Sequence, residues 1–392
     1  MLLQLRKEYL IAVVLCFLAI YAFVPTESET STFPMVVRTV AVTVLMVVSI
    51  VNIAELRFQF AIPLVLIVFY FSVLAVISFS FRYFVAVIVV SAAFCWAVAF
   101  YQSKIFRRAT VFAINFLIYF SIGFLVLQFL EYYSTGRLFD YHNLIFPWSE
   151  ARLPLWSSLA RVGGAYLEPG TYANWIYVFL LFRLFLDRSA GFLLVPLVSF
   201  TMIFSMSAWG VLVGIFVISV YAFGKLDKTV LLYFLSALIG GYVVFSLLEL
   251  GDVWALLENK IFYSGSRESR DGTLQEFLGI YPDWLIFGLG FGKVFCVDCT
   301  SPQDAGLIIS LVVVYGLPFA IFVLAVIYFF AFKQGGLQLL VLTLPLLTTK
   351  LFYWEHVLWF VFMLSLLGLL LRSVLDRWNP EGVDEVVFLR RV

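Results

Sequence analysis

The chain has 392 residues, of which 64% are apolar and only 12% are charged, and its mean hydropathy is +1.05. A soluble domain carries about 25% charged residues, so this composition excludes a globular cytosolic enzyme and indicates a polytopic membrane protein whose surroundings are a lipid bilayer. The 25 Lys and Arg nearly balance the 24 Asp and Glu, which excludes a large basic surface for nucleic acid.

Long unbroken apolar runs predict about twelve membrane-spanning helices, because a helix of about 20 apolar residues crosses the hydrocarbon core of a bilayer. In chain order the runs centre on 9–24, 36–53, 59–77, 83–101, 111–130, 172–186, 192–205, 209–224, 229–250, 306–331, 338–353 and 357–373. The apolar stretch 192–224 is broken only at 205–210, and we interpret it as two short spans. A single long tilted helix would instead reverse the predicted orientation of every later span and loop. Residues 1–392 are thus predicted to form a single all-α integral membrane domain.

The basic residues predict the orientation of these spans. Arg6 and Lys7 precede the first run, which we interpret as an uncleaved anchor with a cytoplasmic N-terminus. Counting from there puts the C-terminus and 15 of the 25 Lys and Arg on the cytoplasmic side, as the positive-inside rule requires. Seven others fall in two long outward loops, about 131–171 and 251–305, where we expect the chemistry. Snorkelling toward the headgroups is expected of charged residues near predicted span ends, namely Arg38, Arg183, Asp187, Lys350 and Glu355.

Cysteines and histidines do not form a recognisable metal site. Cys296 and Cys299 form a C-x-x-C in the second loop, where a small disulfide clamp is expected in an oxidising compartment. The two histidines, His142 and His356, lie in different outward segments, and no carboxylate cluster takes their place. We therefore predict neither a metal ion nor another cofactor.

The first loop ends in ArgValGlyGlyAlaTyrLeuGluProGly at 161–170, just before the next span. Arg161 is close to the membrane face, where it would meet an anionic headgroup; the alternative is an arginine that merely keeps its charge in the headgroup layer. Glu168 stands beside Pro169 at the start of the following span, where its plain interpretation is a first-turn carboxylate that offsets the macrodipole of that helix.

The second loop carries Arg267 and Arg270, which share one face if the segment is helical and would then form an anion clamp. The alternative is an exposed pair answered by neighbouring acidic residues. GlyLeuGlyPheGly at 288–292 follows no strand, so we interpret it as a tight turn with a close backbone approach rather than a nucleotide-binding motif. Asp304 stands at the mouth of the following span, where its plain interpretation is an N-terminal cap.

Aromatic residues crowd both loops, and most are expected in the belt at the water interface. Rings beside arginines and carboxylates also suit a sugar-binding site, because a ring covers the apolar face of a pyranose while polar groups take its hydroxyls. Tyr166 in the first loop and Tyr281 in the second are the candidates for such a contact.

Taken together, the two loops resemble the O-antigen polymerase and O-antigen ligase superfamily of bacterial inner-membrane glycosyltransferases. The run 161–170, read as R-x-x-G-x-x-x-E-P, is similar to the motif that these proteins carry ahead of a span after their first large periplasmic loop. The stretch 267–316 is similar to their second signature: an arginine, Pro282, the glycine turn, then AspAlaGlyLeu leading into the next span.

The resemblance implies an O-antigen polymerase with an architecture like that of the GT-C glycosyltransferases, in the bacterial inner membrane with its active site on the periplasmic side. Donor and acceptor would be undecaprenyl-diphosphate-linked oligosaccharides, and the glycan would pass, with inversion and without a metal, to the non-reducing end of a lipid-linked repeat unit. Arg161 and Arg270 would hold the diphosphate with Arg267 in support, and Glu168 or Asp304 would take the proton of the acceptor hydroxyl. A chain-length regulator is implied as a protein partner.

Two other functions stay open at this point. Ligases of the superfamily, which transfer the glycan to lipid A core, usually carry a histidine near the end of the second loop, where this chain has Asp304; this departure favours a polymerase. A transporter of lipid-linked oligosaccharides would concentrate ionisable residues within its spans, whereas here seven basic residues lie in the two outward loops.

Overall fold

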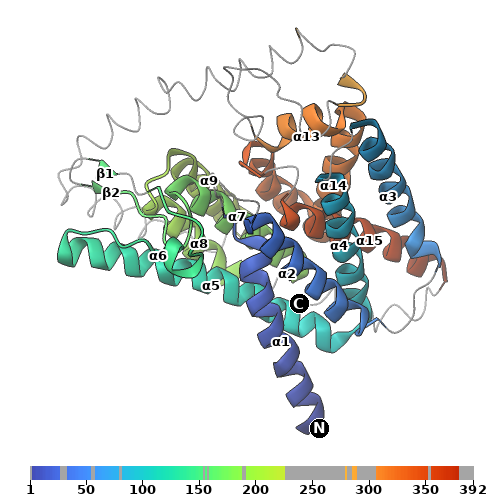
Figure 1. Cartoon of the computed structure of the whole chain (residues 1–392), viewed down its shortest axis with the longest axis horizontal. Coiled ribbons are helices and arrows are strands. Elements are labelled where there is room, and N and C mark those ends of the chain that lie inside the picture. Colours follow the sequence, from blue (N-terminus) through green and yellow to red (C-terminus); the bar gives the residue numbers. More distant parts are fainter. Residues whose placement is uncertain are drawn as a thin grey trace.

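The computed structural model of the chain is an assembly of α-helices with one short pair of strands (Figure 1). It describes residues 2–26, 33–53, 58–78, 82–152, 155–156, 159–187, 191–225, 279, 285–288, 306–351 and 355–378. The elements are α1 (Leu2–Phe23), α2 (Phe33–Ile50), α3 (Phe58–Ser78), α4 (Arg82–Gln102), α5 (Lys104–Thr135), α6 (Tyr141–Ile145), β1 (Leu155–Trp156), β2 (Leu159–Ala160), α7 (Pro169–Leu186), α8 (Gly191–Phe204), α9 (Ala208–Lys225), α13 (Leu307–Tyr315), α14 (Leu317–Thr343), the 3₁₀ helix η3 (Leu344–Thr348) and α15 (His356–Trp378). β1 and β2 pair antiparallel.

Several helices are long and apolar enough to cross a membrane, as the composition predicts. Among the described residues α2, α4, α5 and the segment Leu317–Thr348 meet this criterion, and shorter apolar helices accompany them. The prediction of an all-α protein with several apolar helices of this kind is therefore confirmed. The expected span 229–250 lies outside the described residues, so the total of about twelve spans stays a prediction, and so does the orientation.

Most of the predicted spans in the N-terminal half coincide with helices. α2, α3 and α4 begin and end within a few residues of the predicted ranges, and α7 covers 169–186 where the hydropathy predicts 172–186. α1 and α5 are longer than predicted, because their charged or polar ends stay helical. At the start of α5 the Ser103 hydroxyl accepts a hydrogen bond from the N–H of Phe106 at 3.2 Å, a cap that holds the basic first turn in the helix.

The interpretation of 192–224 as two short helices is confirmed. α8 and α9 are separated by a turn in which Met206 has φ 54°, the left-handed region. A Cβ added to Gly214 would lie 2.8 Å from the carbonyl oxygen of Ser199, so α9 runs back closely alongside α8. A single long helix through this stretch is thereby excluded.

Two predicted spans near the C-terminus are wrong in extent. The run 306–331 is broken at Gly316, where φ is 86°, and this glycine separates α13 from α14. Gly288, the first glycine of the 288–292 motif, has φ 71°, and a Cβ there would collide with the carbonyl of Val314 and the nitrogen of Gly316. The predicted close backbone approach is therefore confirmed for Gly288, since only glycine fits both the conformation and the space.

The second correction concerns the expected span 338–353. α14 reverses direction at Gly336, whose φ of 60° and ψ of −154° are not helical. Beyond this turn the carbonyl of Thr343 accepts a hydrogen bond from the Tyr328 hydroxyl at 3.1 Å, whereas a straight helix would hold these two residues more than about 20 Å apart. The segment after Gly336 is thus a short returning arm that ends in η3, and it is no full span.

Four of the charged residues near the predicted span ends are paired with one another inside the protein, so snorkelling is the wrong explanation for them. The Arg183 guanidinium is buried against α5, where its Nε donates to Asn115 Oδ1 at 2.8 Å and its Nη2 pairs with Asp187 Oδ2 at 3.1 Å. Glu355, 1% exposed, forms an ion pair with Arg38 that links the start of α15 to α2. Because unpaired charges are costly away from water, these groups are held by partners inside the protein.

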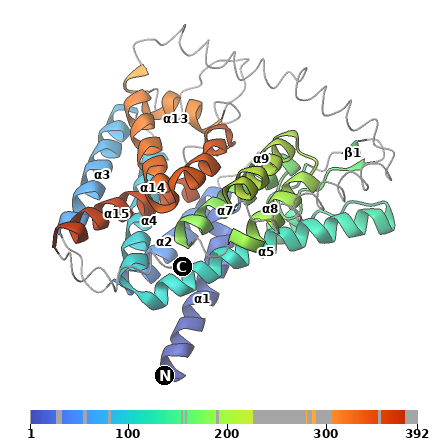
Figure 2. The same ribbon diagram turned by 180° about the vertical axis from the view of Figure 1, so that it is seen from behind.

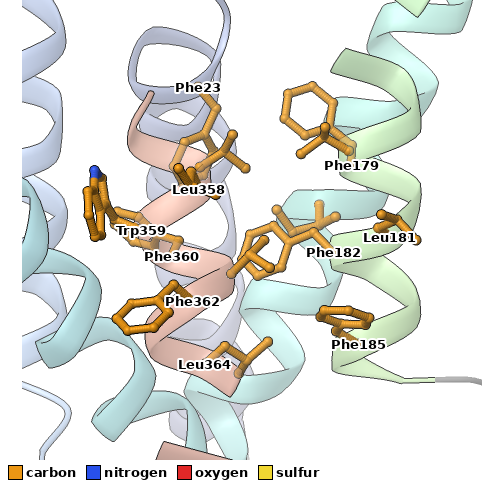
Figure 3. Packing of buried hydrophobic residues seen from close by; sticks show 14 of the residues in the cluster. Phe23, Phe179, Leu181, Phe182, Phe185, Leu358, Trp359, Phe360, Phe362 and Leu364 are labelled. Carbon is orange, nitrogen blue, oxygen red and sulfur yellow. The ribbon is translucent and has the colours of Figure 1, made fainter. Parts of the chain in front are cut away.

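Figures 1 and 2 show how the helices are arranged around α1 and α2. α3, α4, α13, α14 and α15 lie on one side, α6 to α9 lie on the other, and α5 runs along both groups. The core between them is aromatic: in Figure 3 Phe182 of α7 faces Phe360 of α15, with Phe23 of α1 close to both. Ring centroids of Phe23 and Phe360 are 5.1 Å apart and those of Trp96 and Phe182 are 5.3 Å apart, typical separations for packed aromatic pairs. This packing fixes α7, whose first turn carries the candidate site.

Candidate functional site

The first of the two long loops predicted from the sequence, about 131–171, follows α5 and is folded by short-range hydrogen bonds. Gly136, at φ 71°, donates its N–H to the carbonyl of Tyr132 at 2.7 Å and so caps the end of α5. Asp140 then caps α6: its Oδ1 accepts from the N–H of Asn143 at 2.8 Å and its Oδ2 from the N–H of Ala151 at 2.9 Å. The carboxylate of Asp140 therefore closes the first half of the loop on itself.

His142 joins the two halves of the loop. Its ring is fully buried, with Nδ1 2.8 Å from the carbonyl oxygen of Ala165 and Nε2 2.9 Å from the Ser149 hydroxyl. A carbonyl only accepts, so Nδ1 donates to it and Nε2 of the neutral ring accepts from Ser149. Burial lowers the pKa of His142, although the bond to Ala165 and the charge of Asp140 oppose this. His142 is thus a neutral residue that holds the loop together.

Gln128 of α5 fastens the far end of the loop to the helix. Its side-chain oxygen accepts from the N–H groups of Gly163 and Gly164 at 3.0 and 2.8 Å, and its amide nitrogen donates to the carbonyl of Phe139 at 2.9 Å. Gly164 has φ 59°, and a Cβ there would lie only 2.7 Å from the backbone nitrogen of Leu125. Gly164 is therefore required where the loop lies directly on the backbone of α5.

Tyr166 lies in the core rather than at a binding surface. Its side chain is fully buried, its hydroxyl is 2.7 Å from the Ser121 hydroxyl on α5, and its ring packs edge-on against Tyr172. Burial raises the pKa of the Tyr166 phenol, partly offset by the bond to Ser121. We therefore assign Tyr166 to docking the loop on α5 and leave it out of the binding site described below.

Arg161 is half-buried and directed at the turn between α8 and α9. Its Nε donates to the carbonyl of Met206 at 3.3 Å. Met206 is the one non-glycine residue with positive φ in the described part of the chain, and this strained turn presents its carbonyl to the guanidinium. Burial lowers the pKa of Arg161, and the nearby charge of Glu168 acts in the opposite direction. The guanidinium stays charged even so, because its ordinary pKa is above about 12.

Glu168 occupies the position that precedes α7, with Pro169 in the first turn, but its side chain makes no capping hydrogen bond to that helix. Its Oε1 instead lies 3.6 Å from the Nζ of Lys350, and the two side chains are 33% and 34% exposed. The carboxylate is therefore accessible and is flanked by two cationic side chains, those of Arg161 and Lys350.

The backbone at Lys350 is tied to the same end of α7. The peptide N–H of Lys350 donates to Asn174 Oδ1 at 2.9 Å, and the amide nitrogen of Asn174 donates to the carbonyl of Gly170 at 2.7 Å. Because the first of these bonds involves the main chain of Lys350, the backbone at this residue is fixed independently of what its side chain contacts.

Two more helices begin beside this segment. The indole N–H of Trp209, in the first turn of α9, donates to the Thr348 hydroxyl at 3.1 Å. The N–H of Leu307, the first residue of α13, donates to the carbonyl of Thr349 at 2.9 Å. The N-terminal ends of α7, α9 and α13 therefore surround segment 348–350, and each such end carries positive partial charge.

The structure thus brings together part of the site predicted from the sequence. Arg161 and Glu168 lie at one end of the helix assembly, and Gly306, two residues after Asp304 in the sequence, packs against the backbone of 347–348. The remaining predicted residues lie outside the described residues: Arg267, Arg270, Tyr281, Asp304, Cys296 and Cys299.

Sequence reasoning missed Lys350 and the Met206 carbonyl as parts of this site. The sequence indicates only that Lys350 lies in a short turn predicted on the same side of the membrane as the two long loops. This predicted common side is the one feature from which its place in the site could have been inferred. Among the described residues no group of three His, Cys, Asp or Glu side chains is placed to hold a metal ion. Comparisons with models of protein families, with curated proteins and with solved structures gave no match.

Proposed function

We propose that this protein is an O-antigen polymerase, a membrane glycosyltransferase that transfers a glycan from undecaprenyl diphosphate to the non-reducing end of a second lipid-linked repeat unit. The observation that carries the proposal is the grouping of Arg161, Glu168 and Lys350 at one end of the helices, among three helix N-termini. The resemblance of 161–170 to the superfamily motif agrees with it. The proposed location is the bacterial inner membrane, with this end on the periplasmic side.

The leaving group of the proposed reaction is a diphosphate, and its developing negative charge needs stabilisation. Arg161 supplies a forked donor, and the helix N-termini add positive partial charge around it. Charge-assisted hydrogen bonds contribute about 1.5–3 kcal/mol each, and preorganised donors in a water-poor site act most strongly on charge that develops in the transition state. Arg270 and Arg267 are proposed to complete this set from the second loop.

Bond formation requires a base for the acceptor. In the proposed step the acceptor hydroxyl oxygen attacks the anomeric carbon from the face opposite the diphosphate, and the anomeric C–O bond breaks with its electron pair going to the diphosphate. The hydroxyl proton passes to a carboxylate, for which Glu168 is accessible and Asp304 remains the second candidate. The step inverts the anomeric configuration and uses the chain's own residues only.

The test is a reconstituted assay with matched variants. Purified protein is given undecaprenyl-diphosphate-linked repeat units alone or together with lipid A core, and the products are resolved on a gel. We expect a ladder on the undecaprenyl carrier without lipid A. We expect Arg161→Ala to abolish it and Arg161→Lys to restore little, because a point charge does not fork across two phosphate oxygens. Glu168→Gln and Asp304→Asn, made separately, identify the base.

Arg137 provides the control. It is an exposed arginine of the same loop, so Arg137→Ala removes the same charge and should leave the ladder intact. Glycan found only on lipid A would identify a ligase, and no bond formation with either acceptor would favour a transporter. A normal ladder from a folded Arg161→Ala protein would refute the role given to that arginine.

A further inference from the structure

The turn between α8 and α9 has a backbone conformation that its sequence does not favour. Met206 has φ 54°, in the left-handed region that glycine adopts readily and that a residue with a Cβ adopts only against a steric penalty. Such strain persists only where the surrounding structure enforces it, and it gathers at functional sites. The mechanism proposed above gives this turn no part. The conformation of Met206 is therefore maintained by contacts elsewhere in the fold.

Contacts on both sides of Met206 hold the turn in place. On the side of α8, Met206 donates its N–H to the carbonyl of Ile203 at 3.1 Å. On the side of α9, a Cβ on Gly210 would lie only 2.7 Å from the Cβ of Ala173 and 2.8 Å from the carbonyl oxygen of Met202. α9 thus begins in close contact with both α7 and α8. The turn between them has no room to open into a more relaxed shape.

The N-terminal end of α9 is also anchored by Trp209. Its indole N–H donates to the Thr348 hydroxyl at 3.1 Å, and its ring packs edge-on against that of Tyr177 on α7, with 5.7 Å between the ring centroids. These contacts involve the neighbours of Met206 in the sequence rather than its own side chain. The packing of α7, α8 and α9 therefore sets the conformation of the turn.

The left-handed conformation determines where the Met206 carbonyl points. This carbonyl accepts a hydrogen bond from Arg161 Nε at 3.3 Å. The turn also lies beside the first turn of α7, since a Cβ on Gly170 would lie 3.7 Å from Ser207 Oγ and 3.5 Å from Glu168 Oε1. A guanidinium is planar and rigid, so a bond at Nε restricts the directions in which its two Nη groups point. The turn therefore reduces the number of orientations open to Arg161 next to the proposed base.

We infer that Met206 is a positioning residue of this site, whose left-handed backbone directs its carbonyl to Arg161 and so orients the guanidinium. The inference rests on the proposed function, in which Arg161 stabilises the charge that develops on the leaving diphosphate. Stabilisation of this kind depends on donors that are oriented before the charge develops, and small displacements of such groups lower the rate strongly. Met206 thereby acts on the reaction through its backbone, whatever other groups contact the guanidinium.

Two substitutions of Met206 separate a role of the backbone from a role of the side chain. Valine, which is β-branched, strongly disfavours the left-handed region, whereas glycine adopts it readily. In the reconstituted assay we expect Met206→Val to lower kcat about 10-fold or more, as for the loss of one hydrogen bond to a charged group, with a smaller change in KM. Met206→Gly should lose clearly less activity. Packing of the side chain predicts the opposite order, so a Met206→Gly protein as slow as Met206→Val would overturn the inference.

Leu212→Val is the matched control. Leu212 is 52% exposed on the same helix, where valine keeps an ordinary helical backbone, so this change should leave kcat as it is. Thermal unfolding checks that each variant is folded and also tests the contact itself. Arg161→Lys removes the Nε donor and Met206→Val moves the acceptor, so the double variant should lose less thermal stability than the sum of the two single losses. A loss equal to that sum would refute the contact.

The two kinds of measurement distinguish this inference from the proposed function. A wild-type ladder together with an unchanged kcat in Met206→Val would leave the polymerase proposal standing and refute the role of Met206. If no protein makes any product, the polymerase proposal fails, while the thermal measurements on the single and double variants still decide whether the turn at Met206 holds Arg161.

Discussion

The contact between Gly164 and the backbone of α5 leads to a quantitative prediction for Gly164→Ala. Gly164 has φ 59°, and a Cβ there would lie 2.7 Å from the nitrogen and 3.0 Å from the Cα of Leu125. These are main-chain atoms of a helix, which cannot move aside as a flexible side chain can. The loop would have to withdraw by roughly 0.7 Å to reach ordinary contact distance.

The cost has two parts. A left-handed conformation costs an L-residue about 1–2 kcal/mol. Withdrawal of the loop also stretches the hydrogen bonds of 3.0 and 2.8 Å from Gly163 and Gly164 to Gln128, and a buried group left without its partner costs about 1–3 kcal/mol. We therefore expect Gly164→Ala to destabilise the protein by about 2–5 kcal/mol, and to displace Arg161 and Glu168 on either side of it.

Gly136→Ala is the matched control. Gly136 also has positive φ, 71°, but a Cβ there would meet nothing within 4 Å, so only the conformational cost of about 1–2 kcal/mol applies. Thermal unfolding in detergent, followed by tryptophan fluorescence, should place the midpoint of Gly164→Ala several degrees below that of Gly136→Ala, and only Gly136→Ala should keep the proposed polymerase activity. Equal midpoints for the two variants would refute the reasoning that the loop lies on α5.

Two further predictions follow from buried groups. Burial lowers the pKa of His142 in the folded protein, whereas in the unfolded chain its imidazole takes up a proton below about pH 6.5. The free energy of unfolding should therefore fall as the pH drops below this value, by at most about 1.4 kcal/mol per pH unit. His142→Gln should flatten the midpoint against pH between 7.5 and 5.5, and an unchanged slope would contradict this account. Glu355→Gln leaves the charge of Arg38 uncompensated and should lower the free energy of unfolding by about 3–5 kcal/mol. The double variant Arg38→Met with Glu355→Leu should recover most of this stability. A double variant as unstable as the single one would contradict the pairing.

The positions of most helices follow from the sequence, because they depend on a local property. A run of about 20 apolar residues has one favourable conformation in a bilayer, where every backbone group needs an internal partner. This argument locates α2, α3, α4 and α7 within a few residues. It also finds the turn between α8 and α9, since polar and small residues at 205–210 interrupt an otherwise apolar stretch.

The breaks at Gly316 and Gly336 were not predicted, because hydropathy does not register backbone conformation. Both residues are glycines at positive φ inside apolar sequence. TyrGlyLeuPro at 315–318 and GlnGlyGly at 334–336 carry the relevant signals, since glycine permits the left-handed region and proline starts a new helix. The pair of Arg38 and Glu355 was missed for another reason: the two residues lie on α2 and at the start of α15, far apart in the sequence.

The same distinction applies to the candidate site. Arg161 and Glu168 stand within one short motif, and their proximity could be read from the sequence. Lys350 and Met206 come from segments that approach only when α7, α9 and the returning arm of α14 pack together. Their positions depend on the fold as a whole. The motif alone therefore identifies Arg161 and Glu168 but not the Met206 carbonyl and Lys350, which contact them.

The carboxylate of Glu168 can be compared with the interpretation of this residue as a helix cap. A carboxylate that caps a helix accepts hydrogen bonds from the N–H groups of the first turn. Glu168 makes no such bond, although its Oε1 lies close to the first turn, 3.5 Å from where a Cβ of Gly170 would be. A carboxylate at this place still offsets the macrodipole of α7 through its charge alone, and its Oε1 lies 3.6 Å from Lys350 Nζ. The structure therefore argues against a hydrogen-bonded cap, whereas the role of Glu168 as a base stays a proposal for the variants described above to test.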